Sequence, residues 1–338
     1  MASCSPGALP VRAPTGPTEP TATVAGAVPA ATPRPAPVGL SLTQPAGSLP
    51  GRLLFVADAN VWLLERGQLV PVTSDRVSRQ PTWSRDGRRI ALVKLWTSGS
   101  DLWALDAEGK NALELTDFTY REEARQNYAL QPVWWPDGSR LLFLSQEGTQ
   151  DTQLWQVTLQ DRRRQRLLVH GERSGGLDHP RLSPDGRSLA VTSFQPGGGP
   201  AGRPQVWTYA LPNGPWRQLT DAAGGAYDPE WSPDGARIAY VVRTPDPGRS
   251  TGRHDVWVMR ADGAGARGIT TSGANRAPAW APDGGSLVYL SARAGTFEVW
   301  TVPIVADPSP GTPQPSPVAR QITLGGAIDA QSGLAWAP

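Results

Sequence analysis

The sequence predicts an all-β protein, a six-bladed β-propeller built of four-stranded antiparallel blades. One observation is a motif that recurs at spacings of 51, 48, 49 and 49 residues in the part of the chain that follows residue 50. Another is a composition rich in turn residues, with 37 glycines and 35 prolines in 338 residues. A third is that the two ends of the repetitive region complete each other as parts of one unit. Each element is justified below in chain order.

Residues 1–50 are predicted to be a disordered linker that precedes a propeller of residues 51–338. The segment contains eleven prolines and only three charged residues, and its apolar residues follow no helical or strand period. Such a segment cannot bury enough apolar surface to offset the entropy of ordering it. Because the folded part then begins at a second strand, we expect the linker to leave from the face that holds the tight turns.

Cys4 is the single cysteine, so no internal disulfide is expected. Together with Met1, Ala2 and Ser3 it resembles the end of a bacterial lipobox, in which a small residue precedes a cysteine that becomes lipidated. The apolar stretch expected before such a cysteine is not part of this sequence. We expect lipidation of Cys4 and export to the cell envelope; the alternative is a disordered tail with an incidental cysteine.

The repeat begins with a proline and usually a tryptophan, followed by an Asp-Gly turn. It occurs at Pro81–Gly87, Pro132–Gly138, Pro180–Gly186, Pro229–Gly235 and Pro278–Gly284. Downstream of each copy, a polar residue, Leu or Val, and Trp form a second mark, as in Asp101–Trp103. A threonine closes most units, as Thr116 does.

The chemistry of one unit predicts four antiparallel strands. Proline fixes its own φ and the glycine two residues later accepts a positive φ, so Pro-Asp-Gly closes a hairpin between strands one and two. A loop leads to the Trp-bearing third strand, and a second tight turn leads to the fourth. A sheet with two apolar faces must stack against neighbours, and the radial arrangement of such sheets is a propeller.

The chain ends predict how the ring closes. Leu334–Pro338 is the beginning of a unit without its Asp-Gly turn, and Gly51–Val56 is the continuation of such a unit. We therefore expect one blade to be completed by both ends of the chain. This gives five blades plus one.

The Pro-x-Trp-Ser-Pro-Asp-Gly units, each followed by Asp, Gln or Glu, Leu or Val, and Trp, are similar to the repeats of TolB-type propellers over about residues 51–338. The resemblance implies a six-bladed propeller. It implies little about function, because similar blades occur in periplasmic scaffold proteins, lipoproteins and the non-catalytic half of prolyl oligopeptidases.

Several function classes are disfavoured. A net charge of +2 does not favour nucleic-acid binding through bulk charge, and no apolar run is long enough to span a membrane. Eleven of the fourteen tryptophans occupy repeat positions and are expected to pack between blades. Gly248–Gly252 matches a Gly-x-Ser-x-Gly nucleophile motif but lacks the strand and helix that such a motif needs, so no catalytic residue, cofactor or metal is expected.

Candidate binding residues lie just before strand one of several units, where the topology places the mouth of the central channel on the face of the long loops. These candidates are Arg79, Gln80, Gln131, Asp178, His179, Asp228 and Arg276. Long loops on a rigid scaffold commonly bind partners. The basic residues of Arg162–Arg166 are predicted to be a solvated turn on the other face, with an acidic partner as the alternative.

The sequence thus predicts a monomeric, non-enzymatic propeller that binds a protein or peptide at the long-loop face, with the membrane reached only through a lipid anchor. The alternative is a carbohydrate-binding or metal-dependent polysaccharide lyase-like propeller that uses Asp178, His179 and Asp228.

Overall fold

The fold was analysed in a computed structural model. It describes residues 39–43, 49–97, 99–118, 127–147, 151–168, 176–194, 203–293, 295–305 and 318–338. Cys4 and most of the predicted linker lie outside the described residues. No helix in this part of the chain is long and apolar enough to cross a membrane.

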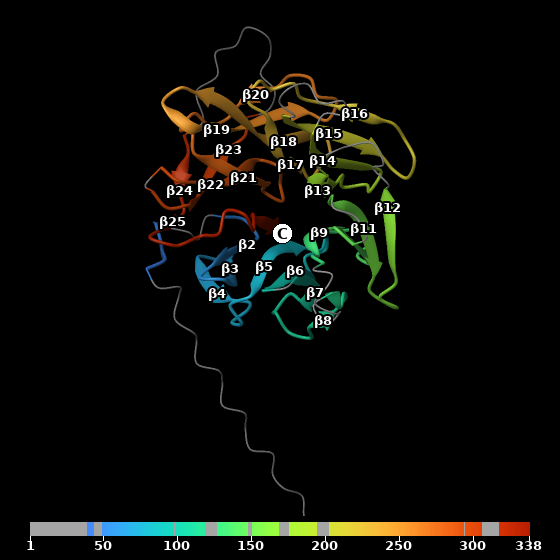
Figure 1. The fold of residues 1–338 in the computed structure, drawn as a ribbon. Helices are drawn as coiled ribbons and strands as arrows, with labels where there is room; N and C mark the ends of the chain where they lie inside the picture. The colour runs from blue at the N-terminus through green and yellow to red at the C-terminus, as the bar shows by residue number, and fades with distance from the viewer. Residues whose placement is uncertain are drawn as a thin grey trace, which may run out of the picture. The chain divides into compact units, whose positions relative to one another are not determined.

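Six four-stranded antiparallel sheets form a ring, as predicted (Figure 1). Blade 1 comprises β5 (Ser78–Trp83), β6 (Arg89–Trp96), β7 (Gly99–Asp106) and β8 (Leu113–Glu114). Blade 2 comprises β9 (Leu130–Trp134), β10 (Arg140–Ser145), β11 (Gln153–Thr158) and β12 (Arg164–Leu168). Blade 3 comprises β13 (Leu177–Leu182), β14 (Ser188–Phe194), β15 (Pro204–Ala210) and β16 (Trp216–Gln218). Blades 4 and 5 comprise β17 (Ala226–Trp231), β18 (Arg237–Asp246), β19 (Arg249–Arg260) and β20 (Arg267–Gly268); and β21 (Asn275–Trp280), β22 (Ser286–Ser291), β23 (Glu298–Pro303) and β24 (Arg320–Gln321).

Blade 6 contains both ends of the folded chain. Its strand order is β26 (Ala335–Ala337), β2 (Arg52–Ala57), β3 (Asn60–Glu65) and β4 (Gln68–Pro71). In the β26–β2 pair, Leu53 lies opposite Trp336 and Leu54 opposite Ala335. The C-terminus accordingly lies at the middle of the ring in Figure 1. The predicted six-bladed closure is confirmed.

The tight turns form for the predicted reason. In blade 3, the Gly186 N–H donates to the Ser183 carbonyl at 2.8 Å, and Gly186 has φ 72°. The Ser183 hydroxyl donates to Asp185 at 2.6 Å, and the Asp185 carboxylate accepts the Arg187 N–H at 3.0 Å. These contacts lower the pKa of Asp185 below its ordinary value, with the Ser183 hydrogen bond as the largest cause. The aspartates of the Asp-Gly turns therefore have a structural role.

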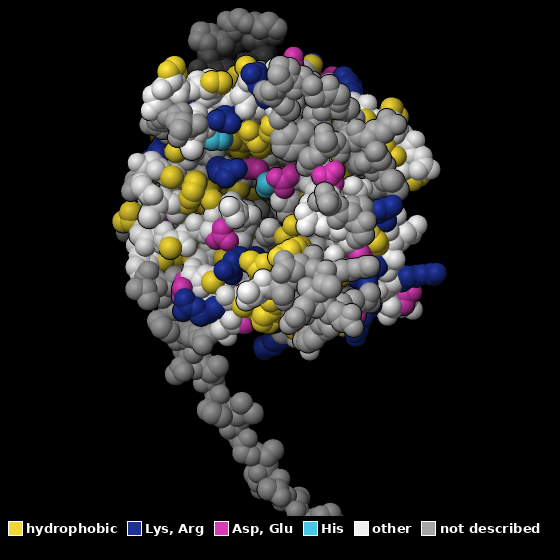
Figure 2. All heavy atoms as spheres, viewed as in Figure 1, with side chains coloured by type: hydrophobic (Ala, Val, Ile, Leu, Met, Phe, Trp, Pro, Cys, Tyr) yellow, Lys and Arg dark blue, Asp and Glu magenta, His cyan; other side chains and the backbone are white. Residues whose placement is uncertain are grey.

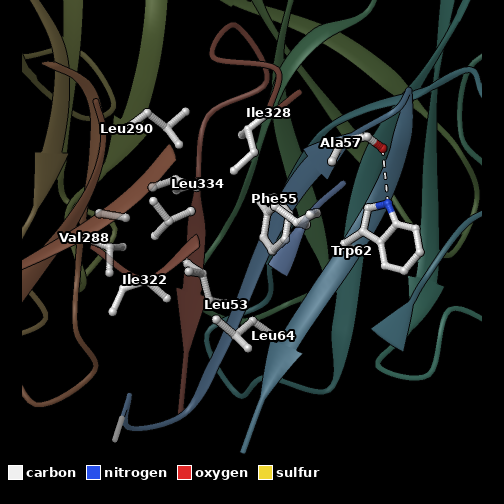
Figure 3. Close-up of a cluster of buried hydrophobic side chains, with 13 residues drawn as sticks. Leu53, Phe55, Ala57, Trp62, Leu64, Val288, Leu290, Ile322, Ile328 and Leu334 are labelled. Atoms are coloured by element: carbon white, nitrogen blue, oxygen red, sulfur yellow. Dashed lines mark hydrogen bonds between the residues drawn. The ribbon is translucent and has the colours of Figure 1, made fainter. Parts of the chain in front are cut away.

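The core consists of apolar layers between adjacent blades. Between blades 5 and 6, Phe55 and Leu290 are fully buried, and Leu334 and Ile328 complete the layer (Figure 3). The first-strand tryptophans tie neighbouring blades together, because Trp134, Trp231 and Trp280 donate their indole N–H to a carbonyl of the preceding blade. The first-strand tryptophans of blades 1, 2, 4 and 5 are buried, as predicted. Among the third-strand tryptophans only Trp62 is buried to the same extent.

The two weaker sequence marks bond to each other inside blades 1, 3, 4 and 5. In blade 1, the Thr116 hydroxyl donates to the buried Asp101 carboxylate at 2.9 Å and accepts the Leu102 N–H at 2.9 Å. Asp101 also accepts the Phe118 N–H at 2.6 Å. The same hydroxyl contact joins the pairs Thr220–Gln205, Thr270–Asp255 and Thr323–Glu298. The polar residue at the start of the third strand therefore fastens the fourth strand and the loop that follows it.

Residues 39–43 correct the predicted linker. β1 (Ser41–Leu42) pairs antiparallel with β25 (Thr323–Leu324), which follows the outermost strand of blade 5. Leu40 is buried beside Ile328, whose bridge to Ala57 lies at the long-loop end of blade 6. The expectation that the chain before the propeller leaves from the tight-turn face is therefore wrong, because this outer strand brings it to the opposite end. The rest of the predicted boundary stays a prediction.

In blades 1 and 4, the connection between the second and third strands, which we expected to be a loop on the long-loop face, is instead largely a β-hairpin. In blade 1, β6 and β7 pair as far as Trp96 and Gly99, and in blade 4, β18 and β19 pair as far as Asp246 and Arg249. Rigid hairpins therefore stand on this face where loops were expected.

Deleting Leu334–Pro338 should abolish cooperative unfolding, because it removes the innermost strand of blade 6 and exposes the apolar faces of blades 1 and 5. Circular dichroism during heating measures this. A variant that lacks only residues 1–38 is the control and should unfold as the full chain does. An unchanged melting temperature of the C-terminal deletion would contradict the role of closure.

Candidate functional site

The innermost strands share a backbone distortion at the mouth of the channel. The residue before the strand-one proline has a positive φ of 49–51° in five blades, although none of the five is glycine. They are Gln80, Gln131, His179, Asp228 and Ala277. In the sixth blade Gly333 has φ 71°. The pairing register shifts at this point, for example between Asp178 and Arg181, so each is a β-bulge that reorients one side chain.

This distortion costs free energy, which marks the mouth as a candidate site. A non-glycine residue in the left-handed region is uncommon, and such strain is on the order of 1–3 kcal/mol per residue. Its repetition around the ring shows that the fold imposes it. The sequence signal was present, since each of these residues directly precedes a proline in an inner strand.

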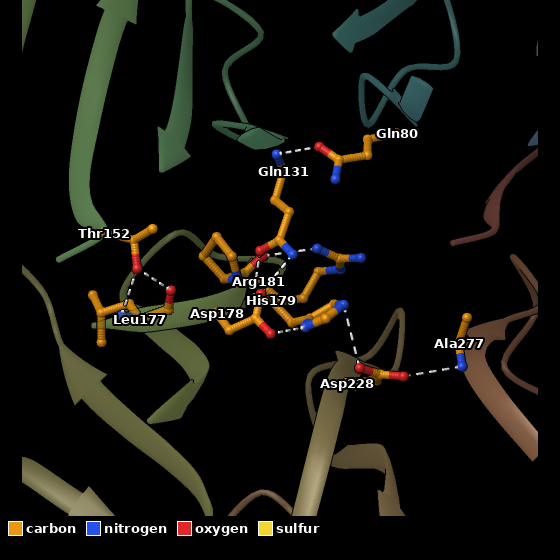
Figure 4. A network of polar contacts seen from close by, with 10 residues as sticks. Gln80, Gln131, Thr152, Leu177, Asp178, His179, Arg181, Asp228 and Ala277 are labelled. Carbon is orange, nitrogen blue, oxygen red and sulfur yellow. Dashed lines mark hydrogen bonds and ion pairs between the residues drawn. The ribbon is translucent and has the colours of Figure 1, made fainter. Parts of the chain in front are cut away.

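The bulged side chains link successive blades (Figure 4). Gln80 Oε1 accepts the Gln131 N–H at 2.7 Å, and Gln131 Oε1 accepts the His179 N–H at 2.6 Å. Asp228 Oδ2 then accepts the Ala277 N–H at 3.2 Å. We call Gln80, Gln131, His179, Asp228 and Ala277 the mouth chain. It ends at Ala277, whose side chain has no hydrogen-bonding atom.

His179 is the charged centre of the mouth chain. Its Nδ1 lies 3.0 Å from Asp178 Oδ2 and its Nε2 lies 3.2 Å from Asp228 Oδ1. Both distances are short enough for an ion pair, but neither His179 Nδ1 nor Asp228 Oδ1 forms a hydrogen bond with suitable geometry among the described residues. The side chains of His179, Asp178 and Asp228 are 25%, 50% and 7% exposed. One imidazole thus bridges blades 3 and 4.

The pKa of His179 is raised above 6.5. Burial acts to lower the pKa, but the carboxylates of Asp228 and Asp178 together outweigh it. Burial likewise acts to raise the pKa of Asp178, and His179 and Gln131 outweigh it, so this pKa is lowered. The two carboxylates therefore favour the imidazolium form of His179.

Below the mouth, a cavity of about 400 Å³ follows the central channel. Arg181 and Glu230 form an ion pair across blades 3 and 4 inside it. Burial raises the pKa of Glu230 above its ordinary value, and Arg181 opposes the shift. Sequence analysis missed this pair, although both residues stand two positions after a mouth-chain residue and so point the same way along the strand.

The opposite wall of the channel is made of small residues. In blades 5 and 6, the positions that correspond to His179 and Arg181 are Ala277 and Ala279, and Gly333 and Ala335. At these positions the channel is therefore lined by polar side chains from blades 2–4 and by small side chains from blades 5 and 6. Acidic, basic and histidine side chains gather near the middle of the face in Figure 2.

The seven predicted binding residues do not all join one network. Gln80, Gln131, Asp178, His179 and Asp228 do. Arg79 pairs instead with Asp329 at 3.4 Å and donates to the Ala59 carbonyl at 3.0 Å. Arg276 has no ion pair with any residue that the structure describes. Partner binding by these seven is taken up below as a proposal.

Asp228 is not a freely solvated charge at an open mouth. Asp228 is 7% exposed, and it caps the Ala277 N–H and pairs with His179. Removing it would leave buried polar groups unpartnered, which typically costs about 1–3 kcal/mol. Asp178, at 50% exposure, is the safer position for a binding test.

Two other sequence motifs have structural explanations. Gly248–Gly252 lies in the β18–β19 hairpin with a strand after it, so it lacks the strand-to-helix turn of a nucleophile elbow. Of the basic cluster, Arg162 and Arg163 lie in the turn as predicted. Arg164 instead begins β12, its guanidinium lies over the Phe118 ring at 4.7 Å, and it pairs with Asp117 and Glu147.

The titration of His179 should distinguish it from His254. His179 should titrate above pH 6.5, whereas burial and the nearby Arg276 and Arg243 lower the pKa of His254. Because the pKa of His179 is raised on folding, its contribution to stability is complete below pH 6.5 and is lost as the pH rises through the raised pKa. NMR of the imidazole C–H signals measures both pKa values.

Replacing the negative charge nearest Nε2, with Asp228→Asn, should lower the pKa of His179 and, to a smaller extent, that of His254, because Asp228 lies 3.2 Å from His179 Nε2 and affects His254 less than burial, Arg276 and Arg243 do. A wild-type His179 that titrates at or below pH 6.5 would contradict the imidazolium bridge.

Comparison with known proteins supports the fold. Residues 176–309 match the family model described as the TolB beta propeller domain. The chain is 33% identical over 88 residues to the uncharacterized peptidase YuxL of Bacillus subtilis (strain 168), covering 25% of this chain and 12% of that protein. It is 38% identical over 88 residues to the Tol-Pal system protein TolB of Anaeromyxobacter dehalogenans (strain 2CP-C), covering 26% and 18%.

Among solved structures, TolB from Acinetobacter baumannii superposes with a TM-score of 0.66 at 22% identity, covering 85% of this chain and 67% of that one. The chain thus matches less than a fifth of the length of either curated relative, and the structural similarity concerns the fold alone. The chain is therefore a six-bladed β-propeller, and its residues 176–309, which contain blades 3 and 4 and three strands of blade 5, are similar to the TolB beta propeller domain.

Proposed function

We propose that this chain is a non-enzymatic propeller that binds a protein or peptide at the long-loop face and the channel mouth. The single observation that supports this most is the strained mouth chain, in which five left-handed residues present side chains at one end of a 400 Å³ channel. Backbone strain that recurs at a cavity mouth is typical of ligand-binding positions. The rigid ring provides a preorganised surface, which lowers the entropy cost of binding.

The charges at the mouth favour a peptide over a polyanion. With His179 protonated, the group of Asp178, His179 and Asp228 has a net charge of −1, and Arg79 in blade 1 and Arg276 in blade 5 each stand one residue before a bulge. Peptides offer both charges and backbone hydrogen-bonding groups, whereas a polyanion would be repelled by the two carboxylates.

The lyase-like alternative receives less support. In the described ranges, no group of three or more His, Cys, Asp or Glu side chains is arranged to hold a metal ion. Both nitrogens of His179 already face carboxylates within 3.2 Å. The structure thus supplies no histidine with a nitrogen directed at a substrate near this group.

We propose a location in the bacterial cell envelope on two grounds. One relative is a Tol-Pal system protein, and Cys4 with its flanking residues resembles a lipidation site. A linker of nearly 40 residues before β1 could extend on the order of 100 Å. An anchor at its start would therefore leave the long-loop face free to meet a partner.

The binding face can be tested with full-length protein used to capture partners from an envelope extract. Asp178→Ala should weaken the binding free energy of the main partner by about 1–3 kcal/mol and lower the melting temperature less than Asp228→Ala does, because Asp178 is 50% exposed and Asp228 only 7%. The matched control neutralises Arg162 and Arg163 on the tight-turn face. Unchanged binding by Asp178→Ala together with lost binding by the control would place the partner on the other face.

Cys4→Ser should move the protein from the membrane fraction to the soluble fraction of cells that express the complete gene, because it removes the thiol that would bear the lipid. Immunoblotting of separated fractions and mass spectrometry of the N-terminal peptide measure this. The lipid anchor would be contradicted if wild-type and Cys4→Ser proteins associate equally with the membrane fraction and the wild-type N-terminal peptide has no added lipid mass.

A further inference from the structure

The floor of the channel, at its tight-turn end, is ringed by the residue that precedes Asp in each turn. In four blades this residue is proline, and in blade 6 Pro338, the last residue of the sequence, stands at the same position of the repeat. All five prolines line the same cavity as the mouth: Pro136, Pro184, Pro233, Pro282 and Pro338. Blade 1 has Arg85 at this position, so one guanidinium stands in a ring of prolines.

The side chain of Arg85 extends across the channel floor. Its guanidinium donates to the Pro184 carbonyl, which belongs to blade 3, so it passes the turn of blade 2. A guanidinium has five N–H donors, and this contact uses one of them. No ion pair joins Arg85 to a carboxylate among the described residues.

The aspartates nearest to this floor are already bonded elsewhere. Each Asp-Gly aspartate accepts hydrogen bonds within its own turn, as Asp86 does from the Ser84 hydroxyl at 2.6 Å and the Arg88 N–H at 3.0 Å. The same contacts lower the pKa of Asp86, with Ser84 as the largest cause. Arg85 is thus a cation in a cavity whose neighbouring carboxylates are occupied.

Space is also left where the proline is missing. A Cβ on Gly186 would lie 3.1 Å from Pro136 Cγ, because Pro136, like Pro184 and Pro233, packs against the turn of the next blade. Gly138, the glycine that follows Arg85 around the ring, would meet nothing within 4 Å. The floor therefore combines a guanidinium with an unfilled position.

The distance between floor and mouth suits a short extended peptide. Gln80 lies in β5 and Arg85 follows five residues later, in the turn after that strand, so the two are at most roughly 17 Å apart at about 3.3 Å per residue. A peptide in the channel has the same rise, so a group at Asp178 and Asp228 would lie about four residues before a terminal residue whose carboxylate is at Arg85. The small side chains of blades 5 and 6 leave room for its backbone.

We propose that the channel is a socket for the C-terminal end of a protein or peptide chain, with Arg85 binding its terminal carboxylate and Asp178 and Asp228 binding a basic side chain about four residues earlier. This rests on the proposed function and adds the direction and chemistry of the ligand. Guanidinium and carboxylate form charge-assisted, often bidentate hydrogen bonds, which explains why an arginine stands at the floor.

The test uses two mixtures of fluorescent pentapeptides with lysine first and four uncharged residues after it, one ending in a free carboxylate and the other in an amide. By fluorescence anisotropy, the full-length protein should bind the carboxylate mixture about tenfold or more tightly than the amide mixture. Arg85→Pro restores the residue of the other turns and should therefore fold, and it should reduce this preference to about onefold. Arg85→Gln, which keeps most of the side-chain length without the charge, should do the same.

Arg88→Ala, in the same turn, is the matched control and should keep the preference. Equal binding of the two mixtures by wild-type protein, absence of binding to both, or a preference that survives Arg85→Pro would each overturn the socket. None of these results concerns the proposed function, which depends on loss of protein capture by Asp178→Ala. If Asp178→Ala loses capture while Arg85→Pro keeps the preference for the carboxylate mixture, the protein binds its partner at the mouth and has no C-terminal socket.

Discussion

The pairing of β26 with β2 is the interaction on which the rest of the structure depends. Each blade has two apolar faces, and both are buried only when the ring is complete. Three residues of β26 complete blade 6, and Leu334 packs in the layer between blades 5 and 6. The closure joins residues that are almost 300 positions apart, so it has a high entropy cost that only the collective burial of the blade faces can offset. The channel, its mouth and its floor exist because this ring is closed.

The rigidity that closure provides is used at the mouth. Left-handed residues before proline are strained, and they persist only where the surrounding sheet over-determines their geometry. The mouth chain shows how this happens, since the side chain of one bulged residue accepts the backbone N–H of the next bulged residue one blade later. Each contact satisfies a polar group that the bulge removes from the regular ladder. The strain and the polar surface thus have one origin, and the position of His179 depends on blade packing as much as on its own strand.

The six blades are alike in fold and unlike in the chemistry they present. Blades 2–4 line the channel with Gln131, His179, Arg181 and Glu230, whereas blades 5 and 6 line it with alanine and glycine. At the floor, Arg85 replaces the proline of the other blades. These departures from the repeat are where a ligand can be recognised, because identical blades would offer the same groups in every direction. The β-propeller fold is compatible with many activities, so the departures are more informative about function than the fold is.

The sequence by itself determined the architecture. The spacing of the Pro-Asp-Gly turns sets the blade size, the polar residue before Leu-Trp or Val-Trp identifies the third strand, and the complementary ends of the repeat predict closure, because all three are local or periodic patterns. It also located four residues of the mouth chain and their partner Asp178, because each of them lies one or two positions before a proline. Only the tertiary structure decided that Arg79 pairs with Asp329, that Arg181 meets Glu230, that Arg85 crosses to blade 3 and that Ser41–Leu42 form an outer strand. Those contacts join residues that are distant in sequence, and their side-chain reach across a ring cannot be read from spacing within one blade.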